Sequence, residues 1–191
     1  MVAATERELA PAIGWGTLCC GVGPVDAASA TARALAEAVE RGTPWRAVVH
    51  VGIAGARRDA GLAPGTLVIG TAAHYDDLGV PERFAPRIVA ADASLLAAAR
   101  GALPEAVLHP IATSARVGAT STAPVEAMEG FAVLRAAALA GVPAVEVRAI
   151  ANDIEEDDRA RWHFDTAFAA ITAATPRLVD AVQRALAALP P

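Results

Sequence analysis

The sequence contains only two cysteines, which are adjacent at positions 19 and 20. A disulfide between neighbouring residues is strained, so no disulfide framework is expected. The apolar residues that flank Cys19 and Cys20 predict two core thiols in a strand, not a metal or redox site. We therefore expect no metal.

The sequence also has no run of basic residues, and its formal net charge is −5. Proteins that bind nucleic acids neutralise phosphates with clustered Lys and Arg, so nucleic acid is not an expected partner. No apolar run approaches the roughly 20 residues that span a bilayer. Residues 1–4 are too few for the apolar part of a secretory signal. We expect a cytoplasmic protein that does not bind membranes.

Complete nucleotide-binding glycine motifs are lacking as well. Gly21 and Gly23 precede a predicted helix, but Asp26 occupies the place of the third glycine of a dinucleotide fingerprint. The stretch GIAG at 52–55 lacks the Lys-Ser/Thr ending of a phosphate loop. No cofactor is expected, and both stretches are interpreted as places where backbone approaches a ligand or a neighbouring strand closely.

What the sequence does contain is a regular alternation of strands and helices. Its 191 residues, 54% of them hydrophobic, predict a single domain over 1–191. The alternation predicts an α/β fold, a three-layer α/β/α domain with a mostly parallel central sheet. Strands are expected at 1–4, 17–20, 47–51, 66–71, 107–113 and 144–150, and helices at 25–41, 92–100, 129–140 and 165–189, the last interrupted near Pro176.

The stretch 125–152 carries the most informative pattern. Apolar residues recur at helical spacing over 129–140, and Gly141 follows where a left-handed residue ends a helix. The apolar strand after it has polar residues at its carboxyl end. Ligands of open α/β sheets bind at that edge, so the site is expected there.

Four segments in this order resemble a known family: GVGPVDAASATARAL, VVHVGIAGARRDAGLAPGTLVIGTAAHYDD, VEAMEGFAV and VPAVEVRAIAND. They are similar to the nucleoside phosphorylase and nucleosidase superfamily, in its branch of methylthioadenosine/S-adenosylhomocysteine nucleosidase and futalosine hydrolase. EAMEGFAV, EVRAIAN and DDRARW look most like futalosine hydrolase. The resemblance implies a nucleoside phosphorylase-like fold, a homodimer and cleavage of the N-glycosidic bond of a small-molecule nucleoside.

Two glutamates match catalytic positions of this family. Glu129 matches the ribose-binding Glu, and a carboxylate there can accept from both hydroxyls of a ribose diol while its charge favours a ribosyl cation. The alternative is a solvated Glu in the first turn of a helix. Glu8 matches the Glu that activates water, with Glu6 as the competitor. Without the resemblance, this charged segment reads as an exposed helix start.

The nucleophile is expected to be water. The resemblance implies that phosphorylases carry an Arg and a Ser at the places of His50 and Ile53, and a phosphate facing isoleucine would lose its hydrogen bond and its cationic clamp. His50, in an apolar strand, is predicted to be a hydrogen-bonded core or wall residue.

Asn152 separates the candidate substrates. Nucleosidases that act on adenine place an Asp here, whereas an Asn amide can donate to a 6-oxo group and accept a hydrogen from N7. A 6-oxopurine such as hypoxanthine is the matching base. Asp153 would restore a catalytic acid if the register shifted by one, and an Asn that only caps a turn is the other alternative.

Further residues are expected around the pocket. Met128 is expected against the ribose or base, and Ala54 and Gly55 along the base. Arg148 either pairs with Glu146 or frames the pocket. Futalosine carries a benzoate on the 5′ side of its sugar, which calls for a cation and aromatic rings. The candidates that the sequence offers are Trp162 and Phe164 for the rings, and Arg57, Arg58, Arg83, Arg116 and Arg161 for the cation.

The predicted function is a nucleoside N-ribohydrolase that cleaves futalosine to hypoxanthine and dehypoxanthine futalosine in menaquinone biosynthesis. Methylthioadenosine/S-adenosylhomocysteine nucleosidase is the second candidate, followed by a purine nucleoside phosphorylase. The segments 8–21 and 118–125 are shorter than in the family, which keeps open a nucleoside-binding module without catalysis. Such a module would need neither Glu8 nor Glu129.

Overall fold

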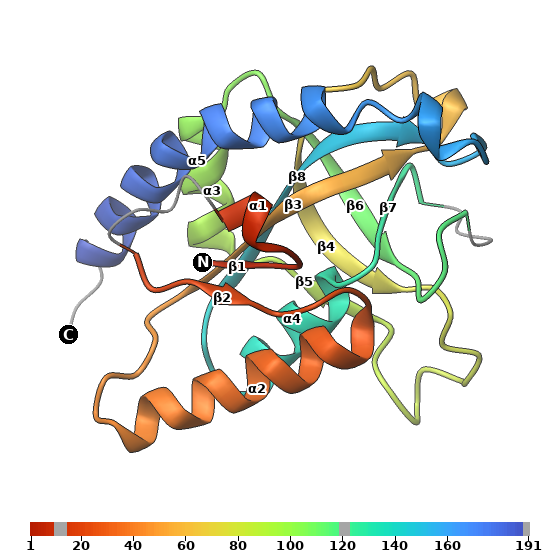
Figure 1. Cartoon of the computed structure of the whole chain (residues 1–191). Coiled ribbons are helices and arrows are strands. Elements are labelled where there is room, and N and C mark those ends of the chain that lie inside the picture. Colours follow the sequence, from red (N-terminus) through yellow and green to blue (C-terminus); the bar gives the residue numbers. More distant parts are fainter. Residues whose placement is uncertain (10–14, 119–122, 189–191) are drawn as a thin grey trace.

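The computed structural model describes residues 1–9, 15–118 and 123–188, in which strands and helices alternate (Figure 1). The strands are β1 (Val2–Ala3), β2 (Leu18–Cys19), β3 (Val48–Ala56), β4 (Leu67–Tyr75), β5 (Ile88–Ala90), β6 (Val107–Thr113), β7 (Val125–Ala127) and β8 (Ala144–Asp153). The helices are α1 (Glu6–Leu9), α2 (Pro24–Glu40), α3 (Ala93–Ala102), α4 (Gly130–Leu139) and α5 (Phe164–Ala187), with short 3₁₀ helices η1 (Arg58–Ala60) and η2 (Arg159–Arg161). The predicted α/β class is confirmed.

The strands form one mixed sheet that closes on itself. β3 pairs with β7 and β8, β7 with β6, β6 with β4, and β4 with β8, so these strands make a ring. The pairs β3–β8, β4–β6 and β6–β7 are parallel, whereas β3–β7, β4–β8 and β4–β5 are antiparallel. The predicted mostly parallel sheet and three-layer arrangement are therefore not confirmed. Strand direction is set by long-range pairing, which the local apolar pattern does not encode.

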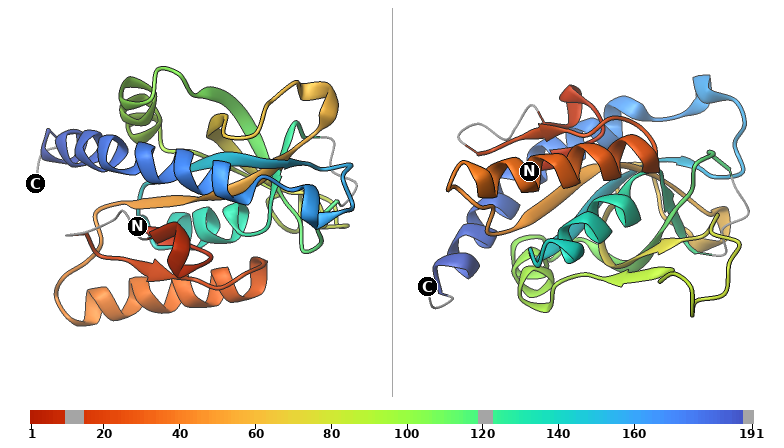
Figure 2. Two further views of the ribbon diagram at one scale, coloured as in Figure 1. Left: turned by 45° about the horizontal axis from the view of Figure 1, so that its top comes forward. Right: turned by 90° about the horizontal axis from the view of Figure 1, so that it is seen from below.

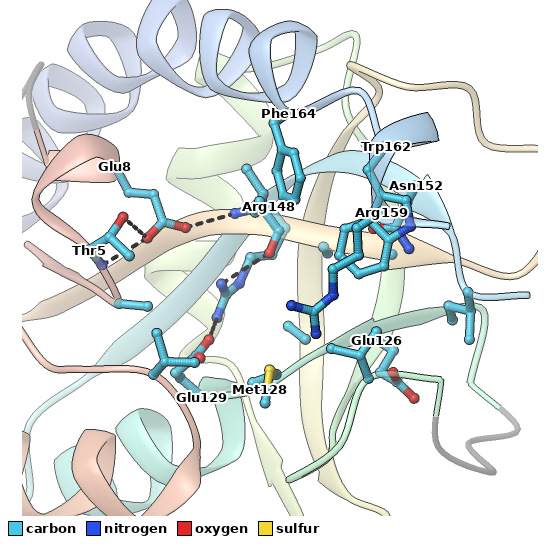
Figure 3. Close-up of a pocket in the computed structure, with 18 of the residues that line it drawn as sticks. Thr5, Glu8, Glu126, Met128, Glu129, Arg148, Asn152, Arg159, Trp162 and Phe164 are labelled. Carbon is cyan, nitrogen blue, oxygen red and sulfur yellow. Dashed lines mark hydrogen bonds and ion pairs between the residues drawn. The ribbon is translucent and has the colours of Figure 1, made fainter. Parts of the chain in front are cut away.

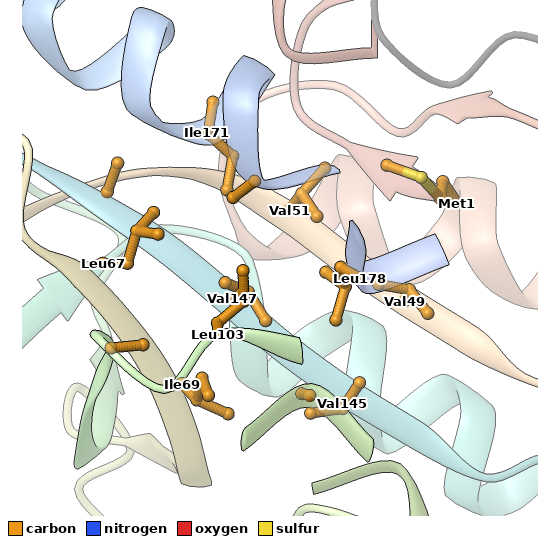
Figure 4. Packing of buried hydrophobic residues seen from close by; sticks show 14 of the residues in the cluster. Met1, Val49, Val51, Leu67, Ile69, Leu103, Val145, Val147, Ile171 and Leu178 are labelled. Atoms are coloured by element: carbon orange, nitrogen blue, oxygen red, sulfur yellow. The ribbon is translucent and has the colours of Figure 1, made fainter. Parts of the chain in front are cut away.

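Helices cover both sides of the β3–β8 part of the sheet (Figure 2). Val49, Val51, Val145 and Val147 alternate along β3 and β8 and pack with α3 and α5, where Leu178 lies in the same cluster (Figure 4). On the other side, α2 packs on α4. A third, smaller cluster fills the inside of the ring with residues such as Val68, Ile111 and Ile150. Because successive residues of a strand face opposite sides, Glu146 and Arg148 of β8 point away from the α3–α5 side, which Val145 and Val147 face.

The strands that bear the predicted site run further than the sequence indicated. β3 continues to Ala56 and β8 to Asp153, because the stretch GIAG still pairs with β8. Gly55 and Ala56, at the end of β3, also pair with β7. The register shifts between Ala54 and Gly55, which is the irregularity that an inserted residue produces in a ladder. Asn152 therefore lies within a strand and not in a turn after it.

The helix predictions hold except at one proline. α2 starts at Pro24, and Asp92 caps α3 by accepting from the amides of Ser94 and Leu95. The expected interruption near Pro176 is wrong, since α5 runs unbroken through it. Pro176 and Thr172, the residue four positions before it, are both exposed, so the carbonyl that loses its amide partner faces water.

The two thiols differ in environment. Cys20 is buried, and burial raises its pKa to about 12, so it behaves as the predicted core thiol. Cys19 is exposed, which corrects the prediction of two core thiols. Among the described residues, no His, Cys, Asp and Glu cluster suited to a metal ion is found, and no helix is long and apolar enough to cross a membrane.

Candidate active site

A cavity of about 550 Å³ lies where β3 and β8 meet α1, the β7–α4 junction and η2 (Figure 3). Most of the residues predicted from the sequence come together around it. Those that line the cavity are Glu8, Ala54, Gly55, Met128, Glu129, Arg148 and Asn152.

Glu8 is fixed at the deep end of the cavity by its own helix start. Oε2 accepts hydrogen bonds from the amide (2.9 Å) and hydroxyl (2.8 Å) of Thr5, three residues earlier, as in a capping box. Oε1 accepts from the amide of Ile53 at 3.1 Å, which ties α1 to β3. The carboxylate is 3% exposed, whereas the competing Glu6 is exposed to solvent. Only Glu8 of this pair lines the cavity.

Glu129 faces the cavity from the start of α4. It is the residue before the helix, but its side chain makes no capping hydrogen bond. Oε1 accepts from the amide of Gly23 at 3.0 Å, and Oε2 lies 3.3 Å from Nη2 of Arg148. Gly23 has φ of 90°, which a residue with a side chain adopts only with strain. Because Glu129 is 4% exposed, it is not the solvated first-turn Glu of the alternative reading.

Arg148 lies between the catalytic candidates and is 1% exposed. Its Nε donates to Oε1 of Glu146 at 2.7 Å, and Nη1 donates to the carbonyl of Ile53 at 3.2 Å. Burial alone would lower the pKa of Arg148, but Glu146, Glu129 and Glu8 together raise it. The sequence left open whether Arg148 pairs with Glu146 or frames the pocket, and the arginine does both.

His50 also contacts the guanidinium of Arg148. Its Nδ1 lies 3.0 Å from the carbonyl of Val2, and its Nε2 contacts Nη2 of Arg148. An arginine cannot accept, so Nε2 is the acceptor and Nδ1 carries the proton. Burial, followed by the charge of Arg148, lowers the pKa of His50 well below its ordinary value. His50 is thus a neutral, fully buried and hydrogen-bonded core residue, one of the two roles predicted for it.

Two glycines make room for this network. A Cβ on Gly52 would lie 2.5 Å from both Nη1 of Arg148 and Oε1 of Glu8. A Cβ on Gly130 would collide with the carboxylate of Glu146. Oε2 of Glu146 is buried and has no hydrogen-bond partner in the described part of the chain, and burial raises the pKa of this group. The packing of Arg148, Glu8 and Glu146 therefore requires glycine at positions 52 and 130.

Asn152 lies at the other end of the cavity, 7% exposed. Its Nδ2 donates to the carbonyl of Asp153 at 2.9 Å, which leaves Oδ1 and the second N–H available to a ligand. Gly55 pairs with Asn152 of β8 on one side and with Glu126 of β7 on the other. The residue between the side chains of Asn152 and Glu126 therefore has no side chain of its own. A Cβ at position 55 would lie 3.1 Å from both Nδ2 of Asn152 and Cγ1 of Ile154, so the glycine leaves room for these two side chains.

Asp153 does not join the site. Its Oδ2 accepts from Nε of Arg58 at 3.3 Å, its side chain is 43% exposed, and it does not line the cavity. Because Asp153 is the next residue along β8, its side chain points to the opposite side of the strand from Asn152. The structure thus gives no support to the register shift that would put an Asp in contact with the base.

The mouth of the cavity is aromatic. The rings of Trp162 and Phe164 are 5.5 Å apart, and those of Phe164 and Phe168 are 6.5 Å apart. All three line the cavity, together with the exposed Arg116 and Arg159. The aromatic wall therefore runs from Trp162 to Phe168, whose ring lies 4.0 Å from Cζ of Arg7, the residue next to Glu8.

Comparison with known proteins agrees with this geometry. The sequence matches the phosphorylase superfamily over residues 17–188. The chain belongs to the phosphorylase superfamily. It is 38% identical to a protein of Streptomyces coelicolor named futalosine hydrolase, over 89% of this chain and 80% of that protein. The resemblance found in the sequence is therefore confirmed.

Solved structures of the superfamily share the fold. A 5′-methylthioadenosine/S-adenosylhomocysteine nucleosidase from Neisseria meningitidis, in complex with methylthio-immucillin-A, matches with a TM-score of 0.77 at 22% identity, over 96% of each chain. A futalosine hydrolase from Helicobacter pylori matches with a TM-score of 0.75 at 17% identity, over 94% of this chain and 95% of that one. The predicted nucleoside phosphorylase-like fold is confirmed.

The phosphate-binding features expected of the superfamily's phosphorylases are missing at the end of β3. His50 is buried beneath Arg148 and does not reach the cavity, and Ile53 presents an apolar side chain to it. Arg148 is a buried cation among the described residues that line the cavity. Its N–H groups already interact with Glu146, Glu129 and the carbonyl of Ile53. The described site thus holds no free cationic clamp for phosphate near the deep end.

Among the pocket residues that sequence reasoning missed are an aromatic, an acidic and a basic side chain: Phe168, Glu126 and Arg159. Phe168 lies one helical turn after Phe164, a spacing that could have revealed it. Glu126, 5% exposed, lines the cavity and accepts from the amide of Gly118 at 2.9 Å. Arg159 follows an acidic run that is typical of a solvated loop. The sequence suggested Arg161, two residues later, as a candidate cation for the 5′ side instead. Arg161 pairs with Glu156 and does not line the cavity.

Proposed function

We propose that this protein is a nucleoside N-ribohydrolase that cleaves futalosine to hypoxanthine and dehypoxanthine futalosine, a reaction of menaquinone biosynthesis. The observation that carries the proposal is the placement of the Glu8 and Glu129 carboxylates around one cavity, on either side of Arg148, without a phosphate clamp. The futalosine hydrolase that is 38% identical to this chain supports the choice of substrate.

The two carboxylates divide the work at the sugar. Glu129 is placed to accept hydrogen bonds from the 2′- and 3′-hydroxyls, and its negative charge stabilises the cationic ribosyl transition state. Glu8, held by Thr5 and Ile53, takes a proton from water while the water oxygen bonds to C1′. The C1′–N9 bond breaks at the same time, and its electron pair goes to the purine. Arg148 pairs with Glu129 at 3.3 Å, and its positive charge interacts with the carboxylate of Glu8.

The base is selected by Asn152. Its N–H donates to a 6-oxo group, and its Oδ1 accepts the hydrogen that N7 carries after departure. The proton itself must come from solvent, because an amide has none to give. In a 6-aminopurine, an N–H group of the base would face the N–H group of Asn152. Two donors cannot form a hydrogen bond with each other, so the N–H of Asn152 would be left without an acceptor.

We predict that Asn152→Asp will shift the preference from 6-oxo- towards 6-aminopurine nucleosides. An Asp accepts from the 6-amino group and can protonate N7, whereas it repels a 6-oxo group unless it is protonated. A change of about tenfold or more in the ratio of kcat/KM for inosine to that for adenosine is expected, the worth of one hydrogen bond to a charged group. Asp153→Asn is the matched control, and an unchanged ratio in Asn152→Asp would remove the base assignment.

The product of the reaction tests the proposal as a whole. Purified protein is incubated with futalosine, methylthioadenosine or inosine, each with and without phosphate, and the products are separated by chromatography. Hypoxanthine from futalosine without phosphate is the expected result. Adenine from methylthioadenosine would favour the second candidate, which the likeness to the Neisseria meningitidis nucleosidase supports. A ribose 1-phosphate product would indicate a phosphorylase, and intact nucleosides would indicate a binding module.

We also infer a single domain over residues 1–191 that acts as a homodimer in the cytoplasm. Large apolar side chains stand exposed on the β4–β5 segment, where Phe84 is 70% and Ile88 is 50% exposed. Covering them with a second copy would remove apolar surface from water. Sedimentation of the purified protein as a monomer at micromolar concentration would contradict the dimer. Segments 10–14 and 119–122, within the two stretches that are short for the family, lie outside the described residues.

A further inference from the structure

We propose that Arg159, stacked on Trp162, is the specificity-determining cation of this pocket and binds a carboxylate on the 5′ side of the nucleoside. This inference rests on the proposed function and deepens it. The sequence offered five other arginines for this role, and the geometry points to a sixth. The class of ligand is an aromatic carboxylate joined to the sugar of a nucleoside.

The position of Arg159 is the first argument. Its Cζ lies 5.5 Å from the centre of the Trp162 ring, and its side chain extends across the cavity in the direction of Met128 (Figure 3). The guanidinium is exposed to solvent at the mouth, not buried with the catalytic carboxylates at the deep end. A ligand whose ribose lies at Glu129 would carry its outer substituent past this group.

The availability of Arg159 is the second argument. The acidic residues near it already have other partners: Glu156 pairs with Arg161, Glu155 with Arg57, and the carboxylate of Asp158 accepts from the amide of Ala160. In the part of the chain that the structure describes, no carboxylate lies within ion-pair distance of Arg159. The fourth acidic residue of the run, Asp157, lines the neighbouring hollow and forms no ion pair with Arg159 in the described structure. The donors of Arg159 are therefore free to bind an anion from solution.

The rings beside Arg159 are the third argument. Nε1 of Trp162 donates to the carbonyl of Glu156 at 2.9 Å, which holds the indole in place. Phe164 and Phe168 continue the aromatic wall from Trp162 along the mouth. An aromatic ring packs on such a wall, while its carboxylate needs a cation at the edge of the wall. Arg159 occupies that edge.

Arg116 is the competing cation, since it also lines the cavity and is exposed. It differs from Arg159 in two respects. No aromatic ring lies against its guanidinium among the described contacts. It also lines a neighbouring hollow that contains the acidic residues Glu155 and Asp157, which would attract it away from the main cavity. Arg159 is therefore the better candidate, and Arg116→Ala is the informative comparison.

The test compares a carboxylic acid with its neutral ester. KM and kcat are measured for futalosine, futalosine methyl ester and inosine with the wild type, Arg159→Ala, Arg159→Lys, Arg116→Ala and Arg161→Ala. Arg159→Ala is expected to raise KM for futalosine about 10- to 100-fold, the range for a hydrogen bond to a charged group. Its KM for the ester and for inosine should stay at the wild-type value, and kcat should change little. Arg159→Lys should recover part of the loss.

Several results would overturn the inference. Arg159→Ala could weaken acid and ester equally, which would indicate packing or a contact with the base. The discrimination could instead be lost in Arg116→Ala or in the surface control Arg161→Ala. If no nucleoside is cleaved, the proposed function fails, and binding of the acid and the ester is then followed by tryptophan fluorescence. Binding of the acid alone that depends on Arg159 would uphold the inference, whereas equal binding of both would end it.

Discussion

Glu129→Gln is expected to lower kcat/KM for the nucleoside by about 10²- to 10³-fold, mainly through kcat. Glutamine has nearly the same shape, so its carbonyl oxygen can still accept from the amide of Gly23. The charge that stabilises the ribosyl cation is lost, however, and the new NH₂ group faces Nη2 of Arg148, where donor meets donor. Steady-state rates with purified variant and wild type measure the effect.

Two comparisons show whether the loss comes from contact with ribose. Glu146→Gln removes the other partner of Arg148 without touching the cavity, so it should cost less than Glu129→Gln. A 2′-deoxynucleoside lacks one of the hydroxyls assigned to Glu129, so the penalty of Glu129→Gln should shrink with that substrate. Equal losses in the two variants, with no dependence on the 2′-hydroxyl, would mean that Glu129 acts only by holding Arg148.

Glu8→Gln is expected to lower kcat by about 10²- to 10⁴-fold with KM nearly unchanged, because a general base acts in the chemical step. The carboxylate oxygens of Glu8 accept from three donors, on Thr5 and Ile53, and an amide can serve only those on its oxygen. The variant should therefore also lose about 1–3 kcal/mol of unfolding free energy. Single-turnover rates together with urea denaturation separate the two effects.

Glu6→Gln is the matched control for Glu8. Glu6 lies two residues earlier on the same short helix and is exposed, so its replacement should leave both turnover and stability at wild-type values. Loss of turnover in Glu6→Gln with retained activity in Glu8→Gln would reverse the assignment of the base. A folded Glu8→Gln protein with full activity would remove Glu8 from the mechanism.

Much of the site was accessible from the sequence because it depends on local patterns and on a family resemblance. Glu129 follows a short strand and precedes an apolar helix, and Thr5 and Glu8 have the spacing of a capping box. The closed, mixed sheet was not accessible. Whether β7 runs parallel or antiparallel to β3 depends on residues far apart in the chain.

The role of charge was also hard to read from the sequence. Arg159 follows four acidic residues, a context that indicates a solvated loop, and only the fold shows that Glu155, Glu156 and Asp158 have other partners. The apolar strand around His50 indicated its burial, but its neutrality follows from contact with Arg148, which lies on another strand. Asn152 and Asp153 are adjacent in sequence, but strand geometry sends only the first towards the cavity.

The ring of strands has a consequence for behaviour in concentrated solution. Where a strand of the ring is paired on both sides, as β6 is at residues 111–113, its backbone donors and acceptors are already used. In the described chain the sheet ends at β2 and β5, which are two and three residues long. Such short edges are poor templates for pairing between molecules, which is how many sheet proteins begin to aggregate. Amyloid-like stacking through these short sheet edges is therefore disfavoured.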